Sequence, residues 1–357
     1  MFRSMESGEE GFSIWSITGL IGAQMAAKAA IELNVFNIIN EAGPEAQLSS
    51  AEIVSKIPTT NHKAAAIALD KILAMLTTKS ILSSSLRLRP DHKQERIYGL
   101  TMASRTLVTN GGGVSIAPLV LFACEKEFVD SLYMAKETVL EPGCSPFRKA
   151  HGSDLFEYLA KNPRLSRMFN EEMECFSKIL LHKVLKVYSG FQDVKELMDV
   201  GGGNGATLEK IVSIYPHVKG INFDLPHVVA DAAISCPGVE HIAGDMFDSL
   251  PNAQTILLKS ILHDWDDDRC IMLLRKCWQA LPEDGKVIAL EFGAPCGNVV
   301  ESELAVATDF FMMVLNVGGK ERTVAELEDL AKAAGFGETL AFCIDKEIQL
   351  MEFIKKN

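Results

Sequence analysis

The chain has 357 residues, of which 35 are basic and 47 acidic, so its net charge at pH 7 is −12. An acidic chain is a poor candidate for binding phosphate backbones, and we therefore expect no nucleic-acid partner. With 48% hydrophobic residues, it is long enough to bury one large core or two ordinary ones.

The cysteines and the hydropathy pattern indicate a cytoplasmic protein without a membrane partner. No apolar run reaches the ~18 residues of a membrane-spanning helix, and the acidic first residues do not resemble a secretory signal. None of the eight cysteines forms a CxxC pair, and Cys236, Cys270 and Cys277 stand among apolar residues. We interpret them as reduced, partly buried thiols.

The first part of the chain has the order helix, helix, helix, hairpin. Apolar residues recur at helical spacing, and Ser49 with Glu52 forms a capping-box pattern. In chain order we predict helices at Met25–Ala42, after Ser49 and at His62–Met75, then strands at Ile81–Leu88 and Arg96–Leu100.

This order is typical of a winged-helix unit, which we assign to residues 1–115. A DNA-binding unit needs a basic recognition helix, but His62–Met75 carries only Lys63 and Lys71 against Asp70. We therefore interpret the unit as a dimerisation module. Residues 116–190 continue as a helical connecting region.

From residue 191 onward, apolar segments rich in β-formers alternate with helical segments. This pattern predicts an α/β fold with a parallel sheet covered by helices on both faces. The predicted strands are Glu196–Val200, Gly220–Asp224, Glu240–Ala243, Thr255–Lys259 and Lys286–Glu291. The predicted helices are Thr207–Tyr215, Pro226–Ser235 and Asp267–Leu281. The chain closes with an antiparallel hairpin, Leu340–Ile344 and Gln349–Ile354, and this is the layout of a class I methyltransferase domain.

The glycine-rich turn after the first of these strands is a candidate cofactor site. Gly201, Gly203 and Gly205 let the backbone adopt positive φ and approach a ligand, and the next helix start offers unpaired N–H groups. By itself the turn fits S-adenosylmethionine, a dinucleotide such as NAD(P) through the G-x-G-x-x-A pattern, or a structural turn.

Acidic residues at the ends of the strands extend this candidate site. Asp224 can accept hydrogen bonds from ribose hydroxyls, or cap the helix that starts at Pro226. Asp245 and Met246 follow the third strand, where an acid could accept from an adenine amino group while methionine packs on the ring. Asp199 could face a cationic sulfonium or bond the loop backbone.

The stretch ILHDWDDDRC, residues 261–270, places one histidine among four acids. His263 could be a general base, a metal ligand with its neighbouring acids, or a bystander. We expect Asp267 and Asp268 to cap the following helix and complement its dipole. Trp265 is either a pocket wall or part of the core, and Asp264 could contact an acceptor or the loop backbone.

Several long motifs in the right order resemble the plant caffeic-acid-type small-molecule O-methyltransferases over essentially the whole chain. The stretches that carry this resemblance include LMDVGGGNGATLEKIV, KGINFDLPHV, PGVEHIAGDMFDSLP, LLKSILHDWDDDRC and LNVGGKERT. Others, such as AAIELNVFNIINEAGPEAQLSSAEIVSKIP, are most similar to enzymes that methylate benzylisoquinoline or protoberberine alkaloids. The family's phenylpropanoid methylators carry a polar Asn-Gln pair near the positions of Ala123 and Cys124, and this chain lacks that pair. Its absence argues against a caffeate-like acceptor, so the acceptor stays open between the two classes.

The resemblance implies a role for each motif residue and a homodimer formed through the helical N-terminal half. His263 would be the base, flanked by Glu291 and Glu321, with no metal. The acceptor, a small phenol, would be lined by Met173, Met312 and Asn316, and to these we add Asp264 and Trp265 as candidate acceptor contacts. S-adenosyl-L-methionine would be held by Gly201, Gly203, Asp224, Leu225, Asp245, Met246 and Lys259. An NAD(P)-dependent oxidoreductase and a catalytically silent dimer partner are the alternatives.

Overall fold

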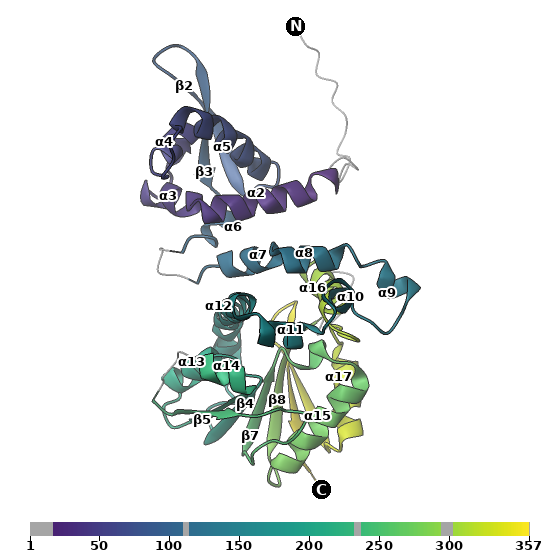
Figure 1. The fold of residues 1–357 in the computed structure, drawn as a ribbon. Helices are drawn as coiled ribbons and strands as arrows, with labels where there is room; N and C mark the ends of the chain where they lie inside the picture. Colours follow the sequence, from purple (N-terminus) through teal and green to yellow (C-terminus); the bar gives the residue numbers. More distant parts are fainter. Residues whose placement is uncertain (1–16, 110–113, 232–236, 294–302, 357) are drawn as a thin grey trace, which may run out of the picture. The chain divides into compact units, whose positions relative to one another are not determined.

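The computed structural model describes residues 17–109, 114–231, 237–293 and 303–356, which fall into two compact units divided between Cys124 and Glu125 (Figure 1). In these ranges no helix combines the length and the apolar character that a membrane span requires. Each unit has a sheet and a hydrophobic core of its own.

The first unit packs helices around a small antiparallel sheet of order β1-β3-β2. The Ser49 hydroxyl accepts from the Glu52 amide while the Glu52 carboxylate accepts from the Ser49 amide, which confirms the predicted capping box. The helices are α2 Leu20–Glu32, α3 Val35–Glu41, α4 Ser50–Val54, α5 His62–Thr77, α6 Met102–Arg105 and α7 Ala117–Ala123, and the strands are β1 Gln47–Ser49, β2 Leu82–Leu88 and β3 Gln94–Leu100.

One predicted helix, Met25–Ala42, is in fact two helices. Asn34 has a φ of 60° in the left-handed region, which ends α2 and starts α3 in a new direction. Asparagine tolerates this conformation better than most residues. The Asn34 side-chain oxygen also accepts a hydrogen bond from the Asn37 side-chain amide. Hydrophobic periodicity continues across the break because both helices bury apolar faces in the same core.

The second unit is a three-layer α/β domain around a sheet of order β6-β5-β4-β7-β8-β10-β9. Strands β4 to β8 run parallel, and β10 is antiparallel to β8 and β9, as predicted. Its strands are β4 Glu196–Val200, β5 Lys219–Asp224, β6 Val239–Ala243, β7 Thr255–Lys259, β8 Lys286–Phe292, β9 Glu338–Cys343 and β10 Ile348–Ile354.

Helices precede the sheet and connect its strands. The first group is α8 Lys126–Leu132, α9 Glu137–Leu140, α10 Pro146–His151, α11 Leu155–Lys161 and α12 Pro163–Val187. The second group is α13 Ala206–Ile214, α14 Pro226–Asp231, the 3-10 turn η1 Leu262–Asp264, α15 Asp267–Ala280, α16 Glu303–Leu315 and α17 Val324–Ala334. The predicted end of α14 at Ser235 and the predicted environment of Cys236 lie outside the described residues.

Alternating side chains of the central strands pack against different helices. On β7, Ile256 and Leu258 share a core with α15 and α17, whereas Leu257 shares a core with α12 and α13. Figure 1 shows these two helix pairs on opposite sides of the sheet. Because both faces are buried, strands such as TILLK are apolar throughout, as parallel strands typically are.

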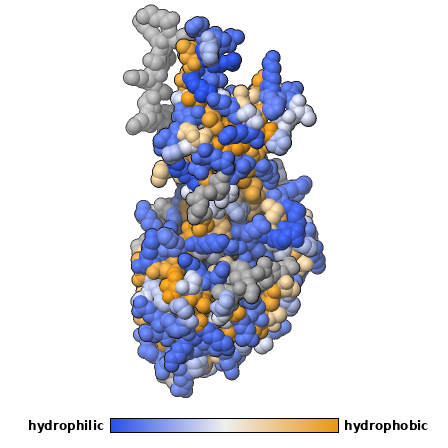
Figure 2. All heavy atoms as spheres, turned by 90° about the vertical axis from the view of Figure 1, so that its left-hand side faces the viewer, coloured by the Kyte–Doolittle hydropathy of each residue, from blue (hydrophilic) through white to orange (hydrophobic). Residues whose placement is uncertain are grey.

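The surface is mainly polar, in keeping with the net charge. On the face shown in Figure 2, hydrophobic residues reach the surface in places among a majority of hydrophilic ones. In the first unit, exposed apolar side chains include Ile17, Leu20, Ile21 and Ile67. They lie outside the core of their unit and are available for contacts with another chain.

The break at Asn34 can be tested by substitution. Asn34→Val should lower the free energy of unfolding by about 1–3 kcal/mol, because a β-branched side chain is strained at positive φ. Asn34→Gly should cost less, since glycine adopts this conformation freely and only the bond to Asn37 is lost. Urea unfolding followed by circular dichroism measures both, and equal losses would contradict the role assigned to Asn34.

Candidate active site

The loops that carry the candidate site residues meet where the strand order of the second unit changes direction. From β4 the chain moves outward to β5 and β6, and β7 then returns to pair with the opposite edge of β4. Ligands of open α/β sheets bind at such a switch point, outside the carboxyl ends of the strands. The glycine turn follows β4 and His263 follows β7, so the fold brings both to this point.

The glycine turn has the backbone conformation that its sequence predicts. Gly201, Gly203 and Gly205 have φ values of 72°, 60° and 89°. A Cβ at Gly201 would lie 2.4 Å from the Ile261 Cδ1 atom, so a larger residue would have to displace that side chain in addition to adopting a strained positive φ. A Cβ at Gly203 would meet nothing within 4 Å, which leaves the backbone open to a ligand at this point.

Asp224 braces the turn from the end of β5. Its carboxylate accepts from the amides of Gly203 at 2.8 Å and Leu225 at 2.6 Å. Burial raises the pKa of Asp224, and the two amides oppose that rise. Each oxygen retains a further lone pair for a ligand hydroxyl, so the loop-bracing and ribose-binding roles are compatible.

A buried acid and a buried lysine, close enough to influence each other's pKa, lie beneath the turn. Asp199 at the end of β4 is 1% exposed, and Lys259 at the end of β7 is 6% exposed. Burial raises the pKa of Asp199 to about 7 and lowers that of Lys259, and each opposes the other's shift. Both Asp199 oxygens lack a hydrogen-bond partner among the described atoms. A buried acceptor of this kind favours a ligand that brings a donor or a positive charge.

The loop after β6 carries the other predicted cofactor residues. The Gly244 amide donates to the Asp224 carbonyl at 2.9 Å, which joins this loop to the end of β5. Asp245 is exposed and accepts from the Phe247 amide, while Met246 is half-buried against the core. The Asp245 carboxylate thus remains accessible beside an apolar side chain, as an adenine site requires.

His263 lies in the turn η1 and faces three carboxylates. Its Nδ1 atom is 3.1 Å from Glu321 Oε1 and 4.0 Å from Glu291 Oε2. Its Nε2 atom is 3.8 Å from Asp264 Oδ1. The structure therefore brings together the predicted trio of His263, Glu291 and Glu321, although they are up to 58 positions apart in the sequence.

The carboxylates control the protonation of the imidazole. Burial alone would lower the pKa of His263, but the negative charges of Glu321, Asp264 and Glu291 together raise it to about 10. Burial raises the pKa of Asp264 to about 7 and also raises that of Glu291. These charges thus favour the imidazolium form of His263 at neutral pH.

Each of these carboxylates has a fixed position. Glu291 Oε1 accepts from the amides of Ile261 and Leu262, at 3.1 and 2.8 Å. Asp264 Oδ1 accepts from the Asn316 side-chain amide at 2.7 Å, so these two predicted acceptor-site residues lie in direct contact. On the Glu321 side, Asp309 of α16 accepts from the Glu321 backbone amide at 2.8 Å. The sequence analysis missed Asp309, because nothing local to α16 signals a partner in the following loop.

The helix cap after His263 differs from the prediction. Asp266 is the N-cap of α15 and accepts from the Arg269 amide at 2.8 Å. Asp267 and Asp268 occupy the first helical turn instead, where their charges complement the dipole. Asp266 has the extended backbone that a cap requires, whereas the next two residues are already helical.

Trp265 is part of an aromatic cluster that adjoins the core. Its ring stacks on Phe156 at 5.8 Å and meets Phe247 edge-on at 4.8 Å. Its Nε1 atom is buried without a described hydrogen-bond partner. The indole therefore packs on the core, as one of the two interpretations expected, and its role as a pocket wall stays a prediction.

The helix that carries Met173 is tied to the glycine turn. Met173 lies half-buried on α12, and its neighbour Glu174 accepts from the Asn204 side chain at 2.8 Å. Met312 lies half-buried on α16, where its carbonyl accepts from the Asn316 amide. Through Asn316, α16 therefore connects to Asp264, whereas α12 connects to the cofactor loop.

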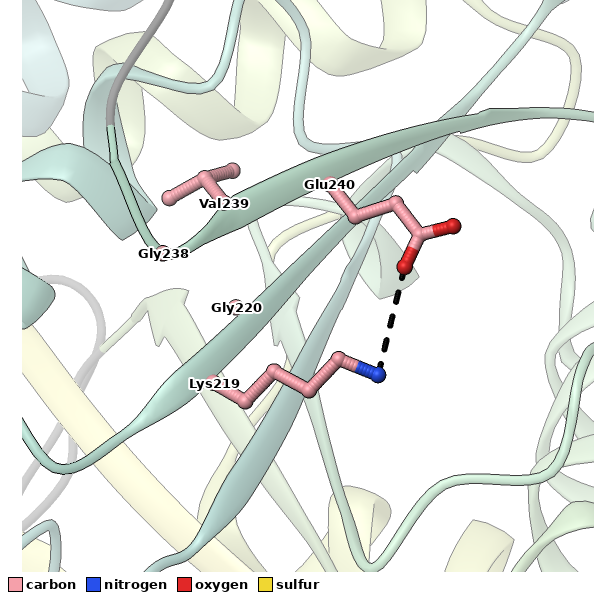
Figure 3. Close-up of a pocket in the computed structure, with 5 residues that line it drawn as sticks. All are labelled: Lys219, Gly220, Gly238, Val239 and Glu240. Carbon is pink, nitrogen blue, oxygen red and sulfur yellow. Dashed lines mark ion pairs between the residues drawn. The ribbon is translucent and has the colours of Figure 1, made fainter.

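Two further features bear on other kinds of site. Within the described ranges, no group of three or more His, Cys, Asp or Glu side chains is arranged to hold a metal ion. A hollow of about 210 Å³ lies at the amino ends of β5 and β6, beside the Lys219–Glu240 ion pair (Figure 3). It lies at the opposite end of these strands from the glycine turn and takes no part in the site.

The chain matches two family profiles. Residues 132–337 match an O-methyltransferase domain, and residues 15–110 match an O-methyltransferase dimerisation domain. Together these matches cover most of the chain and both structural units.

Curated relatives extend over nearly the full length. An (S)-scoulerine 9-O-methyltransferase from Coptis japonica is 52% identical over 356 residues, which is 98% of this chain and 92% of that enzyme. A caffeic acid 3-O-methyltransferase from Medicago sativa is 46% identical, covering 93% of this chain and 91% of that enzyme. Human N-acetylserotonin methyltransferase, solved with S-adenosylmethionine, shares the fold with a TM-score of 0.81 at 21% identity, over 97% of this chain and 99% of that one.

The electrostatic control of His263 gives a test that does not depend on activity. Glu321→Gln keeps the shape of the side chain but removes its charge, so the pKa of His263 should fall by about 1–3. An NMR titration of the imidazole measures this, with the signal identified by its loss in His263→Ala. Glu328→Gln, at an exposed acid of α17, is the matched control. A His263 titration that stays at its wild-type position in Glu321→Gln would contradict the assignment.

Proposed function

The chain belongs to the O-methyltransferase family, and from this premise we propose that it transfers a methyl group from S-adenosyl-L-methionine to a phenolic hydroxyl of a small plant metabolite. The observation that carries the proposal is the pairing of His263 with Glu321 at the switch point of the sheet, beside the glycine turn. This pairing places a potential base next to a potential cofactor site.

The reaction needs help mainly at the acceptor. A phenol has a pKa of about 10 and is a weak nucleophile at neutral pH. The cofactor, when bound, supplies a methyl group that is already activated by its sulfonium. The contribution of the protein is therefore to orient the acceptor oxygen and to remove its proton as it attacks.

We assign proton removal to His263. Glu321 lies on the Nδ1 side, so it can fix the tautomer and stabilise the imidazolium that forms. The Nε2 atom then faces the acceptor, next to Asp264. Because the imidazole must be neutral to act as a base, its raised pKa of about 10 predicts that turnover rises with pH above neutrality.

The cofactor residues follow from the geometry of the turn. Gly201 and Gly203 would let the ligand approach the backbone, and Asp224 with Leu225 would hold the ribose. Asp245 and Met246 would hold the adenine. The orphaned oxygens of Asp199 fit a cationic ligand, and Lys259 beneath the turn balances part of the negative charge.

For the acceptor we propose a benzylisoquinoline or protoberberine phenol, with a phenylpropanoid as the alternative. Support comes from the 52% identity to the scoulerine enzyme against 46% to the caffeic acid enzyme. Ala123 and Cys124 lack the amides that phenylpropanoid methylators carry at this place. Trp265, Met173, Met312 and the Asp264–Asn316 pair would line the site and suit a flat aromatic molecule with polar substituents.

We also propose that the protein is a cytoplasmic homodimer. The dimerisation-domain match over residues 15–110 and the exposed apolar residues of the first unit support the dimer. Cys270 and Cys277, buried as free thiols in α15, suit a reducing compartment.

The base assignment predicts a split between binding and turnover. His263→Ala should reduce kcat by about 10²–10⁴-fold, the usual contribution of general-base catalysis, while calorimetry shows unchanged cofactor binding. His217→Ala, at an exposed histidine, should leave both unchanged. Wild-type kcat in His263→Ala would refute the role, and loss of turnover in EDTA would favour a metal site instead.

The acceptor class can be tested with labelled cofactor. Turnover over a panel of catechols, phenylpropanoids and benzylisoquinolines should be fastest with the alkaloids, and NMR of the product identifies the methylated hydroxyl. Faster turnover of caffeate would overturn the alkaloid proposal. Cofactor binding without methylation of any phenol would indicate a silent dimer partner, and binding of NAD(P) in place of S-adenosylmethionine would indicate an oxidoreductase.

A further inference from the structure

The turn that carries His263 is short and depends on its neighbours for its shape. The turn η1 spans three residues and has no side-chain cap. On its amino side, Glu291 accepts from the amides of Ile261 and Leu262. Lys320 donates its backbone amide to the His263 carbonyl at 2.9 Å. The Leu262 carbonyl accepts from the Trp265 amide and the Cys270 thiol, and the Trp265 carbonyl accepts from the same thiol. A thiol is only a weak donor.

Arg322 adds charged donors to the same two carbonyls, and charged donors form the stronger hydrogen bonds. One terminal nitrogen of its guanidinium donates to the Leu262 carbonyl, and the other donates to the Trp265 carbonyl at 2.6 Å. The Nε atom and one terminal nitrogen also donate to Asp267 Oδ1, at 3.1 and 2.8 Å. The guanidinium therefore connects both ends of η1 to the start of α15.

This arginine is buried to an unusual degree. It is 2% exposed, and it is among the largest fully buried side chains of the described residues. Its charge partner Asp267 is more than half exposed. Burying a cation costs several kcal/mol and the pairing returns only part of it, so such a group is weak evidence for stability alone. The planar fork of a guanidinium instead suits a site that must hold several acceptors in fixed directions.

The residue before Arg322 is Glu321, which pairs with the imidazole of His263. Glu321 and Arg322 are adjacent in the loop after α16, and their side chains act on the same turn. Glu321 bonds the ring of His263, whereas Arg322 bonds the backbone on either side of it. The Arg322 carbonyl is in turn held by the Gln349 side-chain amide of β10. The loop thus connects the imidazole to the rigid sheet.

We propose that Arg322 is a positioning residue for methyl transfer: its buried guanidinium holds the Leu262 and Trp265 carbonyls and so fixes the direction in which His263 presents Nε2. This inference rests on the proposed function, because it assigns the residue to the same reaction. Arg322 does not contact the reacting atoms and acts only through the turn. Its loss should therefore affect the chemical step more than cofactor binding.

The main test uses Arg322→Lys in the full-length protein, with Arg275→Ala as a matched control. Arg275 is an exposed arginine of α15 that donates to a single carbonyl, that of Ala333. Lysine keeps the charge but cannot span both carbonyls. We expect kcat to fall by up to about 10²-fold, as misplacement of a catalytic group typically does, with unchanged KM for S-adenosylmethionine. Arg275→Ala should match the wild type.

Two measurements separate positioning from a general loss of structure. In Arg322→Lys the NMR titration of His263 should move to lower pH, because the ring loses its alignment with the Glu321 carboxylate. In Arg322→Ala, added methylguanidine should restore part of kcat. Wild-type kcat and an unmoved His263 titration in Arg322→Lys would overturn the proposal. A fall in kcat that only follows a lower unfolding temperature, without the NMR change, would also overturn it.

The outcomes also distinguish this inference from the proposed function. A wild-type protein that methylates no phenol would refute the function. The NMR titration would still decide whether Arg322 sets the position of His263. Normal wild-type turnover with an unchanged Arg322→Lys variant would refute the inference alone.

Discussion

The contact between the His263 imidazole and the Glu321 carboxylate, 3.1 Å apart in a largely buried site, constrains the rest of the active region. A buried carboxylate is stable only when hydrogen-bonded or paired with a positive charge. The imidazole carries that charge when protonated. Its affinity for the proton is therefore set by the protein and not by solvent, which is the condition for a base that works in a closed site.

Three carboxylates around one imidazole require a framework that keeps them apart and keeps each one bonded. Main-chain amides provide much of it: those of Ile261 and Leu262 bind Glu291, and that of Glu321 binds Asp309. These donors lie in the segments that follow β7 and α16, so the arrangement needs both segments to be packed together. The parallel sheet achieves this by placing the ends of β7 and β8 side by side.

Buried groups of opposite charge also influence each other near the glycine turn. Asp199 and Lys259 lie beneath the glycine turn, close to neighbouring strand ends, and each shifts the pKa of the other. Glu174 links the helix of Met173 to Asn204 in that turn. The helix that carries Met173 is therefore joined to the glycine turn by a hydrogen bond.

Much of this could be predicted from local pattern. Apolar β-rich segments alternating with helices indicated the parallel sheet, since strands buried on both faces are apolar throughout. The alternating strands at the end of the chain indicated the closing hairpin. The capping box at Ser49 and the positive φ of Gly201 and Gly203 followed from residue types with few alternatives. Resemblance to a family, and not geometry, pointed to Glu291 and Glu321 as partners of His263.

Other features were decided only by the tertiary structure. The left-handed Asn34 interrupts a helix whose apolar periodicity continues unbroken, and the cap of α15 falls on Asp266 because backbone direction, not composition, selects it. Asp264 is bonded to Asn316, and the backbone of Glu321 is bonded to Asp309. Arg322 bonds the carbonyls of Leu262 and Trp265, and each of these partners comes from another part of the chain. The sequence by itself determined most of the elements and where the candidate catalytic groups stand along them, because those depend on neighbouring residues. Only the folded chain decided which buried charges meet, because their partners are brought together by the packing of whole elements.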